Sequence, residues 1–274
     1  MKRDLFLLFF FQLFLVSVSA QIVYPVVGQY KNRTAQGMAI YGDYAYLFND
    51  GGLCRKLNLK TEKIDGEFML QCAAKNTHVN SACFSKQYIS DSHIPALYVT
   101  EFYGKRRCFV EVIHNRTSKL VQTIELRNLQ GKNPFVREWI VDSKEGMLYA
   151  VIREDNQNDR NVIKKFQLPQ LIDGKEIVLT DEQVLDEFSV RFVNGLQGGK
   201  IKGRYMYIAT GFTPLHGEGK YFDREIKVID LKKKKLVRSI DLSKVTVNEP
   251  EDIDFYKGNC LLFAGGTGGI YKAF

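Results

Sequence analysis

Polar side chains stand immediately before five apolar, alternating runs of the sequence. These segments read TAQGMAIYG, THVNSACFS, FVREWIVD, FVNGLQGGK and NEPEDIDFY. They carry carboxylates, amides, an imidazole and a guanidinium, which are groups that bind ligands or move protons. The candidate ligand-binding residues are Gln36, His78, Asn80, Arg137, Glu138, Asn194, Glu251 and Asp252, with Gln197 and Glu249 at corresponding positions.

Each of these residues also has an ordinary explanation, because the turns before β-strands are commonly polar and solvated. The functional interpretation therefore depends on the set as a whole. Carboxylates that face Asn side chains across a channel could hold a hard cation, since calcium prefers oxygen ligands. Calcium is the cofactor that such a set would take, although no residue is assigned as a metal ligand and no catalytic residue is assigned.

The segment NEPEDID carries the most specific hypothesis. Pro250 cannot donate a strand hydrogen bond and favours an extended residue before it, so the strand begins here. Alternation with period two places Glu251 on one face of the strand and Asp252 on the other. We expect both carboxylates to be solvated near a channel mouth, because burying them unpaired is costly. There they would bind a cation or a basic or hydroxylated ligand group, with Asn194 and Asn80 contributing oxygens.

The elements that position these residues recur along the chain. An aromatic-rich strand, a variable loop, an alternating strand, a polar turn and a last strand follow one another repeatedly. Period-two alternation predicts antiparallel sheets, and a recurrence of roughly 45 to 55 residues with four strands each is typical of a β-propeller. The predicted blades are residues 34–71, 78–126, 135–188, 192–242 and 249–274.

The fifth predicted blade lacks a strand. Residues 22–30, IVYPVVGQY, are left over at the other end of the chain. A closed ring removes the exposed sheet edges, so this segment is predicted to complete the last blade. The fold class is therefore all-β, a propeller of five four-stranded blades closed by the N-terminal strand, in a single domain over residues 21–274. In such a ring the innermost strands line a central channel, and their starting ends meet at one mouth.

Residues 1–20 have the pattern of a secretory signal peptide. Lys2 and Arg3 precede an apolar run of about a dozen residues, and Val18-Ser19-Ala20 forms a small-residue cleavage site. This run is shorter than the roughly twenty residues that cross a bilayer. The sequence thus predicts a secreted or periplasmic protein without a membrane span.

Charge and cysteine content restrict the partners further. The formal net charge is +8, but the densest basic run, Lys232 to Lys235, lies between two strand-like segments and predicts a solvated hairpin turn, which argues against a nucleic-acid partner. Five cysteines in an oxidising compartment predict two disulfides and one remaining thiol. Cys54 and Cys108 occupy matching places in two repeats, whereas Cys72 and Cys83 flank one connection.

Several segments resemble known propeller families. IKVIDLKKKKLVRSIDL resembles the strand-turn-strand unit of YVTN-type repeats, and the NG, LYV and GG elements are similar to NHL and gluconolactonase-type propellers. For the last type the resemblance implies a Glu, Asn and Asp set around a divalent metal, to which VNGL and EPEDID are similar. Gln36-Gly37 stands where that family has Glu-Gly-Pro. TAQGMAIYGDYAYL is similar to the opening blade of five-bladed glutaminyl cyclotransferases, but their Asn-Glu-Leu-Glu sequence has no counterpart and only Trp139 is present for the aromatic walls.

The sequence thus favours a binding protein that recognises a small molecule, glycan or peptide at the central channel mouth and acts as a monomer. The alternative is an enzyme, either a metal-dependent lactonase or hydrolase or a cyclotransferase. The four histidines lie in no Gly-x-Ser-x-Gly or HExxH pattern, so a serine hydrolase or a zinc protease is not indicated.

Overall fold

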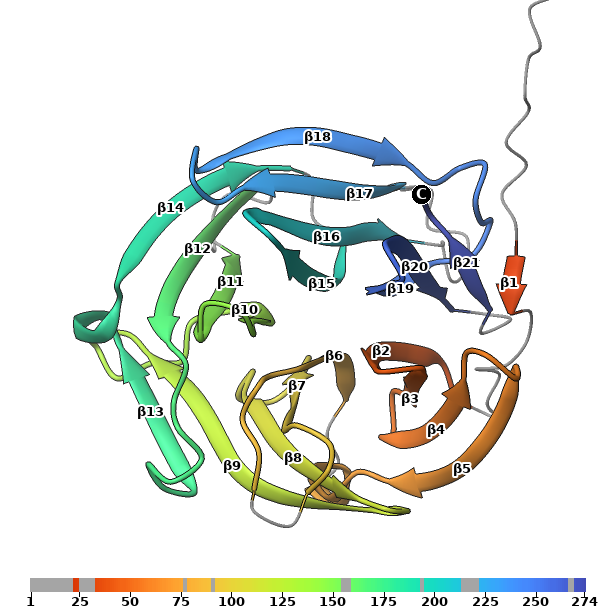
Figure 1. Cartoon of the computed structure of the whole chain (residues 1–274). Coiled ribbons are helices and arrows are strands. Elements are labelled where there is room, and N and C mark those ends of the chain that lie inside the picture. Colours follow the sequence, from red (N-terminus) through yellow and green to blue (C-terminus); the bar gives the residue numbers. More distant parts are fainter. Residues whose placement is uncertain are drawn as a thin grey trace, which may run out of the picture.

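The computed structural model describes residues 22–24, 33–75, 78–89, 92–153, 159–192, 195–212, 222–265 and 269–274. Five antiparallel blades form a ring, as Figure 1 shows, and this confirms the predicted five-bladed propeller. The predicted signal peptide, residues 1–20, and the candidate Asn194 lie outside the described residues. Within the described part of the chain, no helix is long and apolar enough to span a membrane.

Each blade runs from an innermost to an outermost strand. Blade 1 comprises β2 (Ala35–Tyr41), β3 (Tyr44–Asn49), β4 (Leu53–Asn58) and β5 (Lys63–Met69). Blade 2 comprises β6 (Val79–Phe84), β7 (Leu97–Glu101), β8 (Cys108–His114) and β9 (Thr117–Arg127). Blade 3 comprises β10 (Val136–Asp142), β11 (Met147–Arg153), β12 (Arg160–Gln167) and β14 (Asp186–Arg191). Blade 4 comprises β15 (Leu196–Lys202), β16 (Tyr205–Phe212), β17 (Phe222–Asp230) and β18 (Lys235–Asp241).

Blade 5 closes the ring in the predicted way. It contains β19 (Pro250–Tyr256), β20 (Asn259–Ala264) and β21 (Ile270–Lys272), and its outer strand is β1 (Ile22–Tyr24) from the other end of the chain. Ile22 pairs with Tyr271 and Tyr24 with Ile270, so an edge that β21 would otherwise expose is covered. In Figure 1, β1 lies beside β21.

The hairpin turns follow from local side-chain chemistry. The Asn58 side-chain oxygen accepts hydrogen bonds from the backbone amides of Lys60 and Thr61, between β4 and β5. Asp230 accepts from Lys232 and Lys233 in the turn between β17 and β18. Such side chains favour turns because they satisfy backbone donors two and three residues ahead. The basic run is therefore part of a hairpin turn, as predicted.

The third blade differs from the prediction in one strand. The segment expected to form its outer edge is divided between two sheets. Strand β13 (Glu176–Thr180) pairs in parallel with β9 and gives blade 2 a fifth strand, and only β14 joins blade 3. A short 3-10 helix, η2 (Asp181–Gln183), turns the chain between them, and the Gln183 side chain accepts a hydrogen bond from the Thr180 amide. A second 3-10 helix, η1 (Gln71–Lys75), connects blades 1 and 2.

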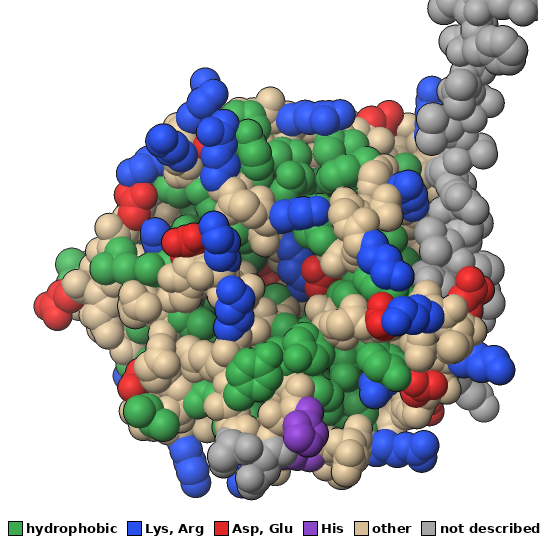
Figure 2. All heavy atoms as spheres, in the orientation of Figure 1, with side chains coloured by type: hydrophobic (Ala, Val, Ile, Leu, Met, Phe, Trp, Pro, Cys, Tyr) green, Lys and Arg blue, Asp and Glu red, His purple; other side chains and the backbone are tan. Residues whose placement is uncertain are grey.

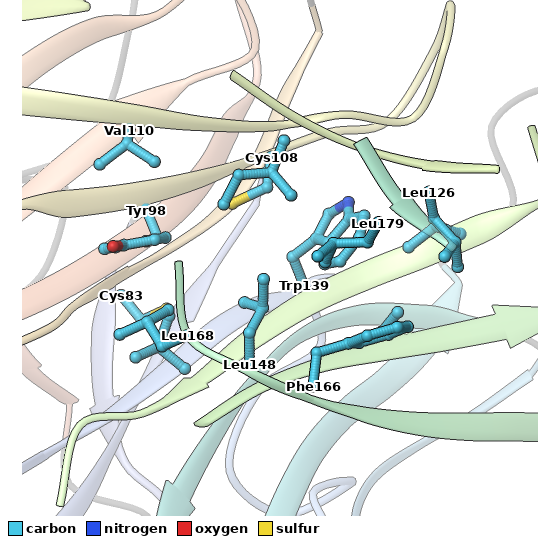
Figure 3. Packing of buried hydrophobic residues seen from close by; sticks show 14 of the residues in the cluster. Cys83, Tyr98, Cys108, Val110, Leu126, Trp139, Leu148, Phe166, Leu168 and Leu179 are labelled. Atoms are coloured by element: carbon cyan, nitrogen blue, oxygen red, sulfur yellow. The ribbon is translucent and has the colours of Figure 1, made fainter. Parts of the chain in front are cut away.

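Apolar side chains pack between neighbouring blades. Figure 3 shows the cluster between blades 2 and 3, in which Trp139 is 2% exposed and its ring lies among aliphatic side chains. Its Nε1 donates a hydrogen bond to the Arg106 carbonyl oxygen at 2.8 Å. Trp139 is thus a core residue and does not take the place of the aromatic walls of glutaminyl cyclotransferases.

The predicted disulfides are absent. All five cysteines, each of them described, are buried thiols that are not joined to one another. Cys54 and Cys108, which occupy matching places in two repeats, belong to different inter-blade clusters, so matching positions do not bring them together. Because free thiols behave as small apolar side chains, these residues fill the core.

Candidate ligand site at the channel mouth

A β-bulge interrupts every innermost strand at its starting end. In all five blades the pairing of the first and second strands shifts register there, between Ala35 and Met38 in blade 1 and between Val79 and Ala82 in blade 2. Bulges bend a strand and re-aim its side chains, and they are frequent beside functional sites. The other three shifts lie between Val136 and Glu138, Leu196 and Gly199, and Pro250 and Asp252.

The bulges hold most of the residues that the sequence singled out. Gln36, Asn80, Arg137, Gln197 and Glu251 lie within these five register shifts, one in each blade. Glu138 and Asp252 follow directly, and His78 precedes β6. The structure therefore brings the described candidates to one end of the ring. Figure 2 shows a hollow at the centre of the ring with charged side chains at its base.

Glu138 anchors a buried polar network between blades 2, 3 and 4. Its carboxyl group is fully buried and accepts hydrogen bonds from the hydroxyls of Ser81 and Thr100 and from the Asn80 amide, the last at 2.9 Å. The same Asn80 nitrogen donates to the Gln197 carbonyl oxygen at 2.6 Å. Burial raises the pKa of Glu138 to about 8, against the opposing effect of these hydrogen bonds.

Asp252 links blade 5 to blades 1 and 2. Its Oδ2 accepts hydrogen bonds from the backbone amides of Met38, at 2.9 Å, and Ala82, at 3.2 Å. Its Oδ1 accepts from the Ile253 amide at 2.8 Å. Burial raises the pKa of Asp252 to about 7, and the nearby Lys200 ammonium opposes that rise. The expectation that Asp252 is solvated at the mouth is wrong, because the carboxylate lies inside the ring with backbone partners.

Lys200 places a positive charge at the centre of this network, and the sequence analysis missed it. Its ammonium donates to the carbonyl oxygens of Met38, at 3.2 Å, and Ala82, and it lies 3.7 Å from an oxygen of Asp254. Burial alone would lower the pKa of Lys200, but Asp252 and Asp254 outweigh it and raise the pKa above its ordinary value. A Lys between glycines and an apolar residue within a strand is the signal that could have indicated it.

This network does not fit the predicted calcium ion. The oxygens of Glu138 and Asp252 already accept from several N–H and O–H donors, and the nearby positive charge is an ammonium group. Among the described residues, no group of three or more His, Cys, Asp and Glu side chains could hold a metal ion. The buried charges therefore join the inner strands to one another, and calcium stays a sequence-based prediction.

Other polar side chains surround the starts of the inner strands. The Gln36 Oε1 lies 3.2 Å from His78 Nε2, and burial lowers the pKa of this histidine. The Gln197 side-chain amide donates to a Glu249 oxygen and to the Gly211 carbonyl oxygen, the latter at 3.2 Å. These contacts connect blade 1 with blade 2, and blade 4 with the segment that leads into blade 5.

Glu251 differs from its neighbours in having no hydrogen-bond partner within the described part of the chain. The residue as a whole is 4% exposed. Burial raises its pKa well above the ordinary value, and the negative charges of Glu249, Asp252 and Asp50 add to the rise. The Oδ1 atom of Asp50 is buried without a partner, whereas its Oδ2 atom lies 3.5 Å from the Arg33 guanidinium group. An unpartnered buried carboxyl group is costly, and such groups are often found where a ligand supplies the missing partner.

An aromatic group in blade 2 surrounds the candidate His78. The ring centroids of Phe102 and Tyr103 are 5.0 Å apart, and His78 lies 5.6 Å and 5.0 Å from them. The Phe102 amide donates to the His78 carbonyl oxygen at 2.9 Å, which fixes this group beside the start of β6. These residues come from a loop, and the strand pattern of the sequence does not place them.

Comparison with known proteins supports the fold. No protein-family model and no curated protein matches the sequence. A glutaminyl cyclase from Myxococcus xanthus is similar in structure with a TM-score of 0.50 at 13% identity, covering 92% of this chain and 94% of that one. The β-propeller domain of Cps50 (Swd1) from Myceliophteria thermophila gives a TM-score of 0.44 at 12% identity, and the match covers 87% of this chain and 82% of that one. The WD40 β-propeller domain of Doa1 gives a TM-score of 0.43 at 12% identity, and the match covers 86% of this chain and 61% of that one. At these identities the likeness extends to the propeller fold alone.

Proposed function

We propose that this protein binds a small ligand through an amine group at the channel mouth, on the side formed by blades 1 and 5. The observation that carries the proposal is Glu251, a residue that is 4% exposed and whose carboxyl group makes no hydrogen bond among the described residues. Asp50 and Glu249 add negative charge beside it. A ligand ammonium group would supply both the missing hydrogen bonds and the compensating charge.

The arrangement favours an organic cation over a metal ion. Asp50, Glu249 and Glu251 interact electrostatically, yet they are not placed as a set that could hold a metal. An ammonium group on a carbon frame offers three donors over a wider span than a metal ion does. Amino sugars, amino acids and peptide N-termini are the ligand classes of this kind, and they agree with the small-molecule, glycan or peptide ligand predicted from the sequence.

The proposal includes the predicted export of the protein. The N-terminal pattern of residues 1–20 supports a ligand that is met outside the cell or in the periplasm. N-terminal sequencing of the protein recovered from those compartments tests this part. A protein that retains residues 1–20 in the cytoplasm contradicts it.

Titration calorimetry with glucosamine, arginine and short peptides tests the ligand class. The Glu251→Gln variant should lose affinity about tenfold or more, because a charge-assisted hydrogen bond is worth about 1.5–3 kcal/mol. The exposed Glu176→Gln substitution in β13 is the matched control and should bind like the parent. Equal affinity of the Glu251 variant for every compound that binds contradicts the site.

The pH dependence gives a second test of the same site. Glu251 has a raised pKa and must lose its proton to pair with an ammonium group, so binding should release a proton and strengthen as pH rises. Calorimetry in buffers of different ionisation enthalpy measures this release. Binding that takes up a proton, or that is independent of pH, contradicts the proposed role of Glu251.

Cyclotransferase activity is the second candidate function. A carboxyl group with a raised pKa at a channel mouth could act as a general acid or base, and Glu251 is such a group. The glutaminyl cyclase that shares the fold motivates this test. Release of ammonia from a peptide with an N-terminal Gln, lost in Glu251→Gln, would favour the enzyme, whereas binding without turnover would favour the binding protein.

A further inference from the structure

We propose a second binding site, for a phosphate or carboxylate group, in a cavity beside blades 2 and 3 where Arg106, Arg137 and Arg153 surround Phe135. The cavity has a volume of about 580 Å³, within the usual range for small-molecule sites. Arg106, Phe135 and Arg153 line it, whereas Arg137 is close to the Phe135 ring but is not a lining residue. This site shares no residue with the proposed amine site.

Two arginine donors, one on the lining residue Arg106 and one on Arg137 beside Phe135, have no acceptor among the described residues. Arg106 Nη1 and Arg137 Nε are buried and make no hydrogen bond. The Arg137 side chain belongs to a residue that is 6% exposed, and neither Arg106 nor Arg137 forms an ion pair within the described residues. Unsatisfied buried N–H groups of a cation are costly, so an anionic acceptor would be bound favourably here.

A single aromatic ring holds the three guanidinium groups close together. The distances from the Phe135 ring centroid to the guanidinium carbons are 4.0 Å for Arg106, 5.5 Å for Arg137 and 5.8 Å for Arg153. Burial lowers the pKa of Arg137 to about 10, and the positive charges of Arg153 and Arg106 add to this effect. The Phe135 ring attracts the nearby guanidinium groups, and a bound anion would reduce the repulsion between Arg106 and Arg137.

The loop geometry keeps Arg106 in place. Arg106 has φ 59°, a left-handed conformation that is uncommon for a residue other than glycine. The hydrogen bond from Trp139 Nε1 to its carbonyl oxygen fixes this conformation from the core. The Arg153 amide donates to the Phe135 carbonyl oxygen at 3.0 Å and so holds the Phe135 backbone. The arginine cluster is therefore built on rigid neighbours.

The charges at the other end of the cavity are already paired. Lys164 lies 2.5 Å from an oxygen of Asp181 and 3.3 Å from one of Glu187. These two carboxylates offset the lysine and give that end little net positive charge. The anionic group should therefore bind at the arginine end, and the rest of the ligand should extend toward the Lys164 end.

Calorimetric titration at constant ionic strength with inorganic phosphate and, separately, with citrate tests the proposal. Either anion should bind. The anion that binds more tightly shows whether the site prefers a phosphate or a carboxylate group. Arg106→Gln and Arg153→Gln should each weaken that binding about tenfold or more, because charge-assisted hydrogen bonds are lost. The exposed Arg238→Gln substitution in β18 is the matched control and should bind like the parent.

Chemical modification of the unaltered protein provides a test that does not depend on how the variants fold. Phenylglyoxal should modify Arg106, and phosphate or citrate should protect it, as mass spectrometry of the digested protein would show. Failure of both anions to bind, or variants that bind as tightly as the parent, would overturn the proposal. Glu251→Gln should leave anion binding unchanged, which separates this outcome from failure of the amine site.

Discussion

The Lys200 ammonium lies 3.7 Å from the Asp254 carboxylate inside the ring, and the two residues come from the innermost strands of blades 4 and 5. The same ammonium donates to backbone carbonyl oxygens of blades 1 and 2. One side chain thus joins four of the five blades. Removing a partner from a buried charge pair leaves an uncompensated charge, so this lysine should be important for stability.

Lys200→Met should lower the free energy of unfolding by about 3–5 kcal/mol, because Asp254 and Asp252 lose their buried positive neighbour. Urea denaturation measures the change. Lys202→Met, on the same strand but exposed, is the control and should unfold near the parent midpoint. Equal midpoints for the two variants would show that the ammonium group is not required.

Stability should fall as pH rises from about 4 to about 8. The pKa of Glu138 is raised to about 8 in the folded protein, whereas an unfolded Glu titrates at about 4.3. The folded state therefore binds the proton more tightly, and its advantage is lost as the pH passes through the folded pKa. The pKa of Asp252 is raised to about 7, so this residue also makes the folded state less stable as the pH rises.

Glu138→Gln tests this assignment, because an amide at position 138 cannot titrate. Urea midpoints of the variant should vary less with pH over this range than those of the parent, while Glu176→Gln should follow the parent. A variant with the full pH dependence of the parent would assign the effect to other groups.

The fold could be predicted because its signals are local. Period-two alternation and turn residues indicated the blades, and an unmatched segment at each end indicated the closure that β1 and β21 form. The segment Glu176–Thr180 was assigned to the wrong blade, because a parallel edge pairing with β9 has the same alternation as an antiparallel one.

The candidate site was only partly predictable. Starts of inner strands converge in any propeller, so Asn80, Glu138 and Glu251 could be grouped from the sequence. Their separate roles could not be predicted, because they depend on burial and hydrogen bonding. Glu138 accepts several hydrogen bonds, whereas Glu251 accepts none within the described residues. Arg106 and Phe135 lie in loops, whose conformations have no periodic signal.

The cysteines should all be recovered as thiols. Burial raises the pKa of Cys83 to about 11 and that of the other four above its ordinary value. Because the thiolate is the reactive form, the folded protein should react slowly with a thiol reagent such as Ellman's reagent. In denaturant without reductant all five thiols should react. A count of three reactive thiols would indicate one disulfide, and a count of one would indicate the two predicted disulfides.

Two glycines beside the acidic residues of β19 should respond differently to a methyl group. A Cβ on Gly198 would meet the Asp252 carboxyl group, with its Cγ at 2.5 Å, and the Asp252 Cα at 2.9 Å, so β15 or β19 must shift. Gly198→Ala should therefore destabilise the protein by about 1–3 kcal/mol, the usual cost of overpacking. Thermal and urea denaturation measure this change.

A Cβ on Gly265 would instead meet the end of the Glu251 side chain, with its Cδ at 3.3 Å. This flexible carboxyl group can move, so Gly265→Ala should change the unfolding midpoint less than Gly198→Ala does. The displaced carboxyl group should bind the amine ligand more weakly, because a hydrogen bond depends steeply on its geometry. Calorimetry on Gly265→Ala measures this loss, and Gly258→Ala, where a Cβ meets nothing within 4 Å but φ is 85°, controls for a local effect of alanine in blade 5. Unchanged binding in Gly265→Ala, together with a loss of stability as large as that of Gly198→Ala, would mean that Glu251 is fixed by packing and does not serve a ligand.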